Sequence, residues 1–184
     1  MEKQAPGTRA MKEVFVMSRI GIFYGSTLGT TKKAAEDLAA LFGEDAALID
    51  VAQAEAEDFE KYPMLLLGSS TWGYGDLQDD WSVALDKLDG VDLSDKKVAL
   101  FGYGDQEGYA DTFVDALGIL YDKVCERKGV VVGAWPSEDF TFSSSKAFRE
   151  GRFVGLPLDD NNQAELTEDR LQKWVEQLKK EFDA

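Results

Sequence analysis

The stretch Gly25-Ser26-Thr27-Leu28-Gly29-Thr30-Thr31 joins a strand-like segment to a helix-like one. It follows the apolar run Ile20-Gly21-Ile22-Phe23-Tyr24 and precedes an amphipathic pattern that begins near Lys32. A helix leaves its first backbone N–H groups unpaired, and its aligned peptide dipoles favour an anion at that end. The turn therefore predicts a phosphate site directly after the first strand of an α/β fold.

The donors of this turn are neutral, because it holds no Lys or Arg. It also lacks the Gly-Lys-Ser/Thr sequence that binds a nucleoside triphosphate with its magnesium ion. A single phosphate monoester fits the turn better. Taken alone, the same pattern fits equally well a helix start at which Ser26 or Thr30 only caps the first turn. Two later loops decide between these interpretations.

The composition indicates one acidic domain. The chain has 184 residues, of which 44% are hydrophobic, enough for a single sizeable core. Its formal net charge is −15, from 20 basic and 35 acidic residues. Such a chain should repel nucleic acid and anionic membrane surfaces and attract basic protein partners. The same charge would also serve solubility alone, and the two roles are compatible.

Two scarce residue types exclude several kinds of chemistry. The chain has no histidine, which excludes Ser-His-Asp and Cys-His hydrolases, and we expect neither a catalytic residue nor a metal site. Cys125 is the only cysteine, so no intramolecular disulfide can form, which fits a reducing, cytoplasmic location. Cys125 lies on the apolar stripe of a predicted helix and should be buried.

The two ends of the chain give further expectations. No apolar run approaches the length of a membrane span. Residues 1–16 carry basic residues without an apolar core, so we expect a disordered N-terminal extension followed by one domain over residues 17–184.

Strand and helix patterns alternate along the rest of the chain. Continuous apolar runs such as Met64-Leu65-Leu66-Leu67 are typical of parallel strands that are covered on both faces. The pattern predicts a doubly wound five-stranded parallel sheet with helices on both faces, whose ligand site lies at the carboxyl ends of the strands. The expected strands span residues 19–24, 46–50, 64–68, 97–102 and 130–134. The last helix should begin at Thr167. Residues 135–162 do not fit the alternation, so we expect an insertion that interrupts the last strand.

Two further loops carry aromatic residues among glycines. The loop after the third strand reads Ser69-Ser70-Thr71-Trp72-Gly73-Tyr74-Gly75-Asp76, and the loop after the fourth reads Gly102-Tyr103-Gly104-Asp105-Gln106-Glu107-Gly108-Tyr109. Trp72 and Tyr109 are poorly placed for the core and well placed to stack on a planar ligand. Two aromatic faces and a phosphate turn together predict a pocket for a flat, mononucleotide-like cofactor.

These three loops resemble those of the flavodoxins, small electron-transfer proteins that hold one FMN noncovalently. The resemblance covers residues 17–182, and its most specific motifs are Thr71-Trp72-Gly73-Tyr74-Gly75-Asp76-Leu77-Gln78 and Asp105-Gln106-Glu107-Gly108-Tyr109-Ala110-Asp111. The insertion, with Gly151-Arg152-Phe153-Val154-Gly155-Leu156, is similar to that of the long-chain subclass.

The resemblance implies a set of FMN-binding residues. The first loop would hold the phosphate, Thr71 would lie along the ribityl chain, Trp72 and Tyr109 would sandwich the ring, and Gly104 and Asp105 would meet its pyrimidine edge. Leu28 stands where flavodoxins usually have Ser or Thr, so we expect a modest loss of affinity. The full expected set is Ser26, Thr27, Leu28, Gly29, Thr30, Thr31, Ser70, Thr71, Trp72, Gly73, Tyr74, Gly75, Tyr103, Gly104, Asp105 and Tyr109.

The resemblance also implies a function: a monomeric, low-potential carrier that cycles between semiquinone and hydroquinone. In the family a backbone carbonyl near Gly73 turns toward protonated flavin N5. Nearby carboxylates, namely those of Asp76, Asp79, Asp80 and Asp105, should disfavour the reduced anion. Expected partners are basic-surfaced redox proteins such as flavin-containing reductases and ferredoxin-dependent enzymes.

Two other functions on a similar fold are weaker. An FMN-dependent NAD(P)H-quinone reductase needs a second binding site, and the sequence shows no second dinucleotide motif. A phospho-receiver domain needs acidic residues after the first and third strands, where this chain has Gly25-Ser26 and Ser69-Ser70.

Overall fold

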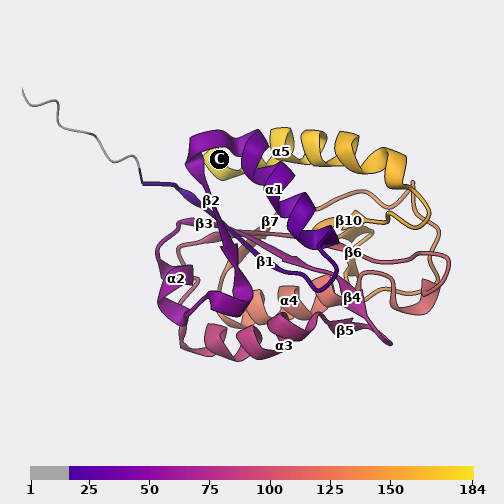
Figure 1. The fold of residues 1–184 in the computed structure, drawn as a ribbon, viewed down its shortest axis with the longest axis horizontal. Helices are drawn as coiled ribbons and strands as arrows, with labels where there is room; N and C mark the ends of the chain where they lie inside the picture. The colour runs from indigo at the N-terminus through magenta and orange to yellow at the C-terminus, as the bar shows by residue number, and fades with distance from the viewer. Residues whose placement is uncertain (1–16) are drawn as a thin grey trace, which may run out of the picture.

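The computed structural model describes residues 17–184, and the expected extension at residues 1–16 lies outside them. One parallel sheet forms the centre of the molecule (Figure 1). Its strands are β1 (Ile20–Gly25), β2 (Ala46–Asp50), β3 (Met64–Ser69), β6 (Lys97–Tyr103), β7 (Val130–Val132) and β10 (Leu156–Leu158). The order across the sheet is β2-β1-β3-β6-β10, with β7 also paired to β6. The predicted doubly wound parallel fold is confirmed.

The fifth position of the sheet is shared by two short strands. β7 pairs with the first half of β6, where Lys97 lies opposite Val130, and β10 pairs with the second half, where Phe101 lies opposite Leu156. The chain between them leaves the sheet and includes a small antiparallel pair, β8 (Phe148–Arg149) and β9 (Arg152–Phe153). The expected insertion is thus present, but it ends earlier than the predicted residue 162, because Leu156–Leu158 already resumes the strand.

Helices cover both faces of the sheet (Figure 1). One face carries α1 (Thr30–Phe42) and α5 (Thr167–Asp183), and the other carries α3 (Asp79–Ala84) and α4 (Asp115–Glu126). A fifth, very short helix, α2 (Ala56–Glu60), precedes β3. α5 begins at Thr167, as the sequence predicts, and the positive φ of Gly43 ends α1.

Apolar side chains of both helix layers pack on the sheet in one core. Trp81, in α3, and Trp174, in α5, are fully buried there. One expectation is wrong: Cys125 is exposed, because it lies at the edge of its helix's apolar stripe rather than at its centre. Within residues 17–184, no helix is both long and apolar enough to cross a membrane.

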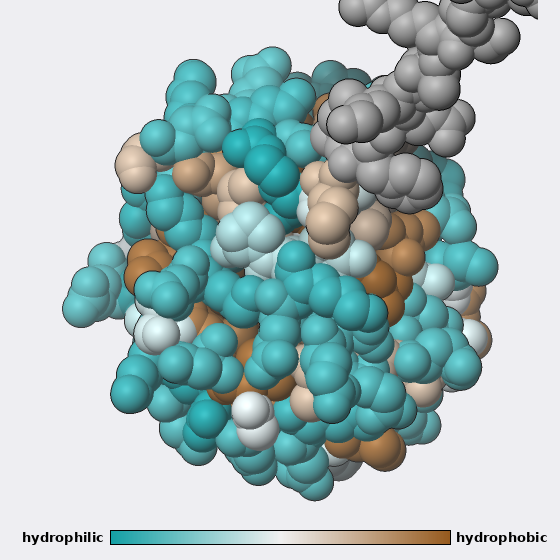
Figure 2. Space-filling view, turned by 90° about the vertical axis from the view of Figure 1, so that its left-hand side faces the viewer, coloured by the Kyte–Doolittle hydropathy of each residue, from teal (hydrophilic) through white to brown (hydrophobic). Residues whose placement is uncertain are grey.

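The surface agrees with the acidic composition. Hydrophilic side chains cover most of the face at the left of Figure 1, and the hydrophobic areas on it are separate from one another (Figure 2). The larger exposed apolar side chains near the carboxyl ends of the strands belong to the loops described below.

Candidate functional site

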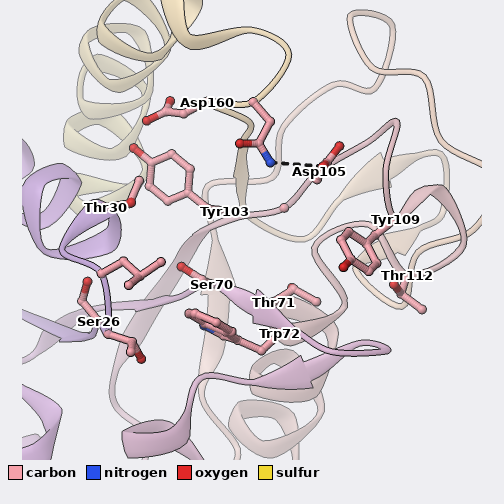
Figure 3. A pocket seen from close by; sticks show the side chains of 14 residues that line it. Ser26, Thr30, Ser70, Thr71, Trp72, Tyr103, Asp105, Tyr109, Thr112 and Asp160 are labelled. Carbon is pink, nitrogen blue, oxygen red and sulfur yellow. Dashed lines mark hydrogen bonds between the residues drawn. The ribbon is translucent and has the colours of Figure 1, made fainter.

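A cavity of about 240 Å³ lies at the carboxyl ends of β1, β3 and β6, where a doubly wound sheet binds its ligand. Side chains from separate loops converge on it (Figure 3). The lining residues are Ser26, Thr27, Leu28, Thr30, Ser70, Thr71, Trp72, Tyr103, Gly104, Asp105, Tyr109, Thr112, Asp160 and Asn161.

The loop between β1 and α1 presents the start of a helix to this cavity. Gly29 precedes α1 in a left-handed conformation, with φ of 92°, and no side chain within residues 17–184 caps the helix start. The first N–H groups of α1 therefore remain available to an anion. Ser26 Oγ accepts a hydrogen bond from Gly29 N at 3.1 Å, which shapes the loop before the helix begins. The loop can hold a phosphate with neutral donors alone.

Two hydrogen bonds tie this loop to neighbouring segments. Thr31 does not line the cavity, because its side chain is fully buried, and its hydroxyl lies 2.6 Å from Ser70 Oγ. Gln78 Nε2 donates to Thr27 Oγ1 at 3.2 Å. The side chain of Thr31 thus supports the loop from below the cavity lining, and Gly29 shapes the turn.

A hairpin follows β3. Its strands are β4 (Thr71–Trp72) and β5 (Asp76–Leu77), and Gly75 N donates to Trp72 O at 3.1 Å across the turn. Trp72 is 38% exposed and borders the cavity, whereas Tyr74 is 91% exposed. Gly73, Tyr74 and Gly75 form the turn and do not line the cavity.

The loop after β6 carries the second exposed aromatic ring. Tyr109 is 55% exposed and lines the cavity together with Gly104. Trp72 and Tyr109 come from different loops and border the same opening (Figure 3). Two exposed rings at one cavity can enclose a planar ligand, since aromatic faces stack on flat systems.

Asp105 shapes this loop with its carboxylate. Oδ1 accepts from Gly108 N at 2.7 Å, from Asn162 Nδ2 at 2.9 Å and from Glu107 N at 3.1 Å, and Oδ2 accepts from Asn161 Nδ2 at 3.1 Å. These bonds, above all the one from Gly108, hold the pKa of Asp105 below its usual value. Because the carboxylate already accepts hydrogen bonds from the protein, this loop can offer a ligand mainly backbone groups.

Three lining residues were not predicted from the sequence: Thr112, Asp160 and Asn161. Asp160 and Asn161 lie in the loop that follows β10, the resumed half of the last strand. Recognition of Leu156–Leu158 as a strand would have placed the next loop at the same edge of the sheet. Asp160 lies near the phenol of Tyr103 (Figure 3). Burial raises the pKa of Tyr103, and Asp160 adds to the shift, so this phenol stays protonated.

The charge around the cavity is negative or neutral. None of the Lys and Arg residues within residues 17–184 lines it. Lys33, one turn into α1, pairs with Asp37 instead. Of the four carboxylates expected around a bound ring, only Asp105 lines the cavity; Asp76 lies on β5, and Asp79 and Asp80 lie in the first turn of α3.

Comparison with known proteins agrees with this arrangement. The sequence model of the family described as "Flavodoxin" matches residues 22–174. A flavodoxin of Nostoc sp. is 49% identical over 165 residues, which cover 89% of this chain and 97% of the relative. Flavodoxin 1 of Azotobacter vinelandii is 46% identical over 171 residues, which cover 90% and 98% of the two chains.

A solved structure has the same fold. The crystal structure of Fusobacterium nucleatum flavodoxin bound to flavin mononucleotide superposes with a TM-score of 0.85 at 30% identity, covering 90% of this chain and 99% of that one. The match to the family model begins within β1 and ends within α5. The chain belongs to the flavodoxin family.

Proposed function

We propose that this chain binds one FMN noncovalently in the cavity and carries electrons between redox proteins. The observation that carries this proposal is the shape of the cavity: a helix start without a side-chain cap lies at one end and two exposed aromatic rings border the other. FMN has a phosphate monoester at one end and a planar ring at the other. The bound flavin supplies the redox chemistry, while the protein binds and orients it.

The residues divide into two groups by their chemistry. Ser26, Thr27 and Thr30 would hold the phosphate, together with the N–H groups at the start of α1. Trp72 and Tyr109 would flank the ring, and backbone groups around Gly104 would meet its polar edge. The ribityl chain between the phosphate and the ring would run past Ser70, Thr71, Tyr103, Thr112 and Asn161.

The turn after Trp72 would respond to the charge on the ring. Gly73 has φ of +52°, a value that glycine adopts without strain. Its peptide can therefore rotate to present a carbonyl oxygen to a protonated ring nitrogen at low cost. A Gly73→Val variant should lose this response, because a β-branched residue disfavours positive φ.

As a member of this family, the chain is an electron carrier and not an enzyme. Its partners would meet the mouth of the cavity, where Leu28, Trp72 and Tyr109 are exposed and Tyr74 stands beside them. An apolar centre on a protein of net charge −15 suits basic-surfaced redox proteins such as flavin-containing reductases and ferredoxin-dependent enzymes. Association should slow as salt rises.

Four finer points complete the proposal. The insertion between β7 and β10 supports membership of the long-chain subclass. Residues 17–184 would act as a single domain, since one core joins both helix layers. We infer that the protein is a monomer and that it works in the cytoplasm, where a chain with one cysteine stays reduced.

The test is stepwise anaerobic reduction of the FMN-loaded protein, followed by visible absorption. A carrier of single electrons should show a long-wavelength band that rises and then falls, and two separate midpoints. Direct bleaching in one step would indicate two-electron chemistry instead. A purified protein that is colourless and does not quench the fluorescence of added FMN would refute the proposal.

A further inference from the structure

The turn between β4 and β5 has one open end and one restrained end. A Cβ added at Gly73 would approach only Asp76 Oδ2, at 3.0 Å. A Cβ added at Gly75 would lie 2.7 Å from Asp115 Oδ2 and 3.2 Å from Asp115 Cβ. The backbone at Gly75 therefore rests directly on the side chain of Asp115, while Gly73 has room to move.

Asp115 is itself held firmly. It is the first residue of α4 and only 3% exposed. Its Oδ1 accepts a hydrogen bond from Lys146 N, in the insertion, at 2.7 Å. The next residue of α4, Ala116, donates its N–H to Thr71 Oγ1 at 3.1 Å. The first turn of α4 thus holds the hairpin at two points, Thr71 and Gly75.

Asp115 is connected to the insertion through the backbone N–H of Lys146 rather than through the Lys146 side chain. The ammonium of Lys146 lies 3.9 Å from Asp115 Oδ2, but this side chain is 59% exposed and its ion pair should contribute little. The backbone bond to Oδ1 is partly buried and directional, and its loss would leave a donor unpaired. The geometry therefore makes Asp115 a bridge between the Lys146 backbone and Gly75.

From this geometry we infer that Asp115 is a positioning residue for redox chemistry: it fixes the Gly75 end of the turn, so that rearrangement is confined to the peptide after Gly73. This inference rests on the proposed function, because the rearrangement matters only when a flavin is bound. A fixed Gly75 end limits the conformations that the turn can adopt. Asp115 would act through the turn, since it does not itself line the cavity. A loose turn would distinguish the redox states of the ring less sharply.

The test compares three substitutions at Asp115 in the FMN-loaded protein. Asp115→Asn keeps the shape and an oxygen acceptor for Lys146 N but removes the charge. Asp115→Ala removes the contact with Gly75 and the acceptor. Asp115→Ser withdraws from Gly75 but keeps a polar atom in the buried site, so it tests the same contact if the alanine variant does not fold. The readout is the separation between the two one-electron midpoints.

The separation between the two midpoints can be expressed as an equilibrium constant. We expect Asp115→Asn to change that constant less than twofold from wild type. Ala and Ser should lower that constant at least tenfold, which corresponds to ~59 mV for one electron. Two controls should leave it unchanged: Glu126→Gln, which removes a charge near the far end of α4, and Lys146→Ala, which keeps the backbone donor.

Two results would overturn the inference. If Ala and Ser keep the wild-type separation while only lowering the unfolding free energy, Asp115 is merely structural. If Asn loses as much as Ala, charge rather than contact sets the potentials. Either result would leave the proposed function intact, since that fails only if the wild-type protein does not bind FMN or is reduced in a single step.

Discussion

The two ends of the cavity are built in different ways. The end proposed for the phosphate comes from one loop of consecutive residues, 26–31, between β1 and α1. The end proposed for the ring combines the hairpin after β3, the loop after β6 and the loop after β10, which are far apart in the chain. The first end needs only a strand, a turn and a helix, whereas the second depends on the whole fold.

The insertion supports the ring end through hydrogen bonds to the loop after β6. Thr141 N donates to Gln106 Oε1 at 2.6 Å, and the N–H groups of Ser143 and Ser144 both donate to Ala110 O, at 2.9 and 3.0 Å. Ala110 directly follows Tyr109 in the chain. The insertion therefore holds the loop of Tyr109 from outside, and disturbing it should affect the ring end more than the phosphate end.

The largest expected effect comes from emptying the core beneath the insertion. Phe153 is fully buried, and its ring centroid lies 5.1 Å from that of Phe142 and 5.8 Å from that of Phe113. Phe153→Ala should lower the unfolding free energy by about 3–5 kcal/mol, and Leu38→Ala, in α1, by about 2–5 kcal/mol. Urea unfolding of the FMN-free protein measures both.

The two substitutions should differ in their effect on the affinity for FMN under native conditions. Phe153→Ala should weaken FMN, because Phe113 lies between Tyr109 and α4 and loses its support. Leu38→Ala should weaken FMN less at comparable instability. Equal losses of affinity in the two variants would mean that the insertion gives the ring end no special support.

The next prediction separates the two ends by ligand. Thr30→Val removes a donor from the phosphate end and should weaken FMN by about 1.5–3 kcal/mol, the usual value for a hydrogen bond to a charged group. Riboflavin, which lacks the phosphate, should bind this variant as it binds wild type. Trp72→Ala should weaken both ligands by about 1–3 kcal/mol, as is usual for loss of a stacking platform. Fluorescence quenching titrations measure all four affinities.

Trp72→Phe serves as the control, since it keeps an aromatic face and should recover much of the affinity. If Thr30→Val weakened riboflavin as much as FMN, its hydroxyl would not act at the phosphate. If Trp72→Ala weakened only FMN, the indole would not face the ring.

This difference between the ends also explains what the sequence could predict. The strand–turn–helix of residues 20–42 and the convergence of the three loops follow from local patterns, and the structure has both. Asp160 and Asn161 were missed because their strand, Leu156–Leu158, is only three residues long and is separated from β7 by the insertion. Asp105 was expected to face the ligand, yet its bonds to Asn161 and Asn162 depend on tertiary packing that no local pattern shows.

A smaller effect should come from Leu28 at the phosphate end. Its side chain is 82% exposed and borders the cavity, so a polar residue can replace it without disturbing the core. Leu28→Thr should strengthen FMN binding by ~1 kcal/mol, about fivefold, through one added hydrogen bond. Leu28→Ala is the matched control and should leave the affinity near wild type. A weaker complex with threonine would indicate that the leucine contributes an apolar contact with the ligand.

The smallest effect should appear in the pH dependence of the ring end. The hydrogen bonds that lower the pKa of Asp105 stabilise the folded state while its carboxylate is ionised. This stabilisation is fully present above the unfolded pKa, about 3.9, and is lost as pH falls through the lower folded pKa. Asp105→Asn should therefore be less stable than wild type at pH 6, and the gap should narrow at about pH 3. Urea unfolding at both values measures it. Asp37→Asn, which changes a partly exposed carboxylate of α1, controls for the general effect of charge. A gap that stays constant between the two pH values would mean that the loop depends on the shape of Asp105 rather than on its ionisation.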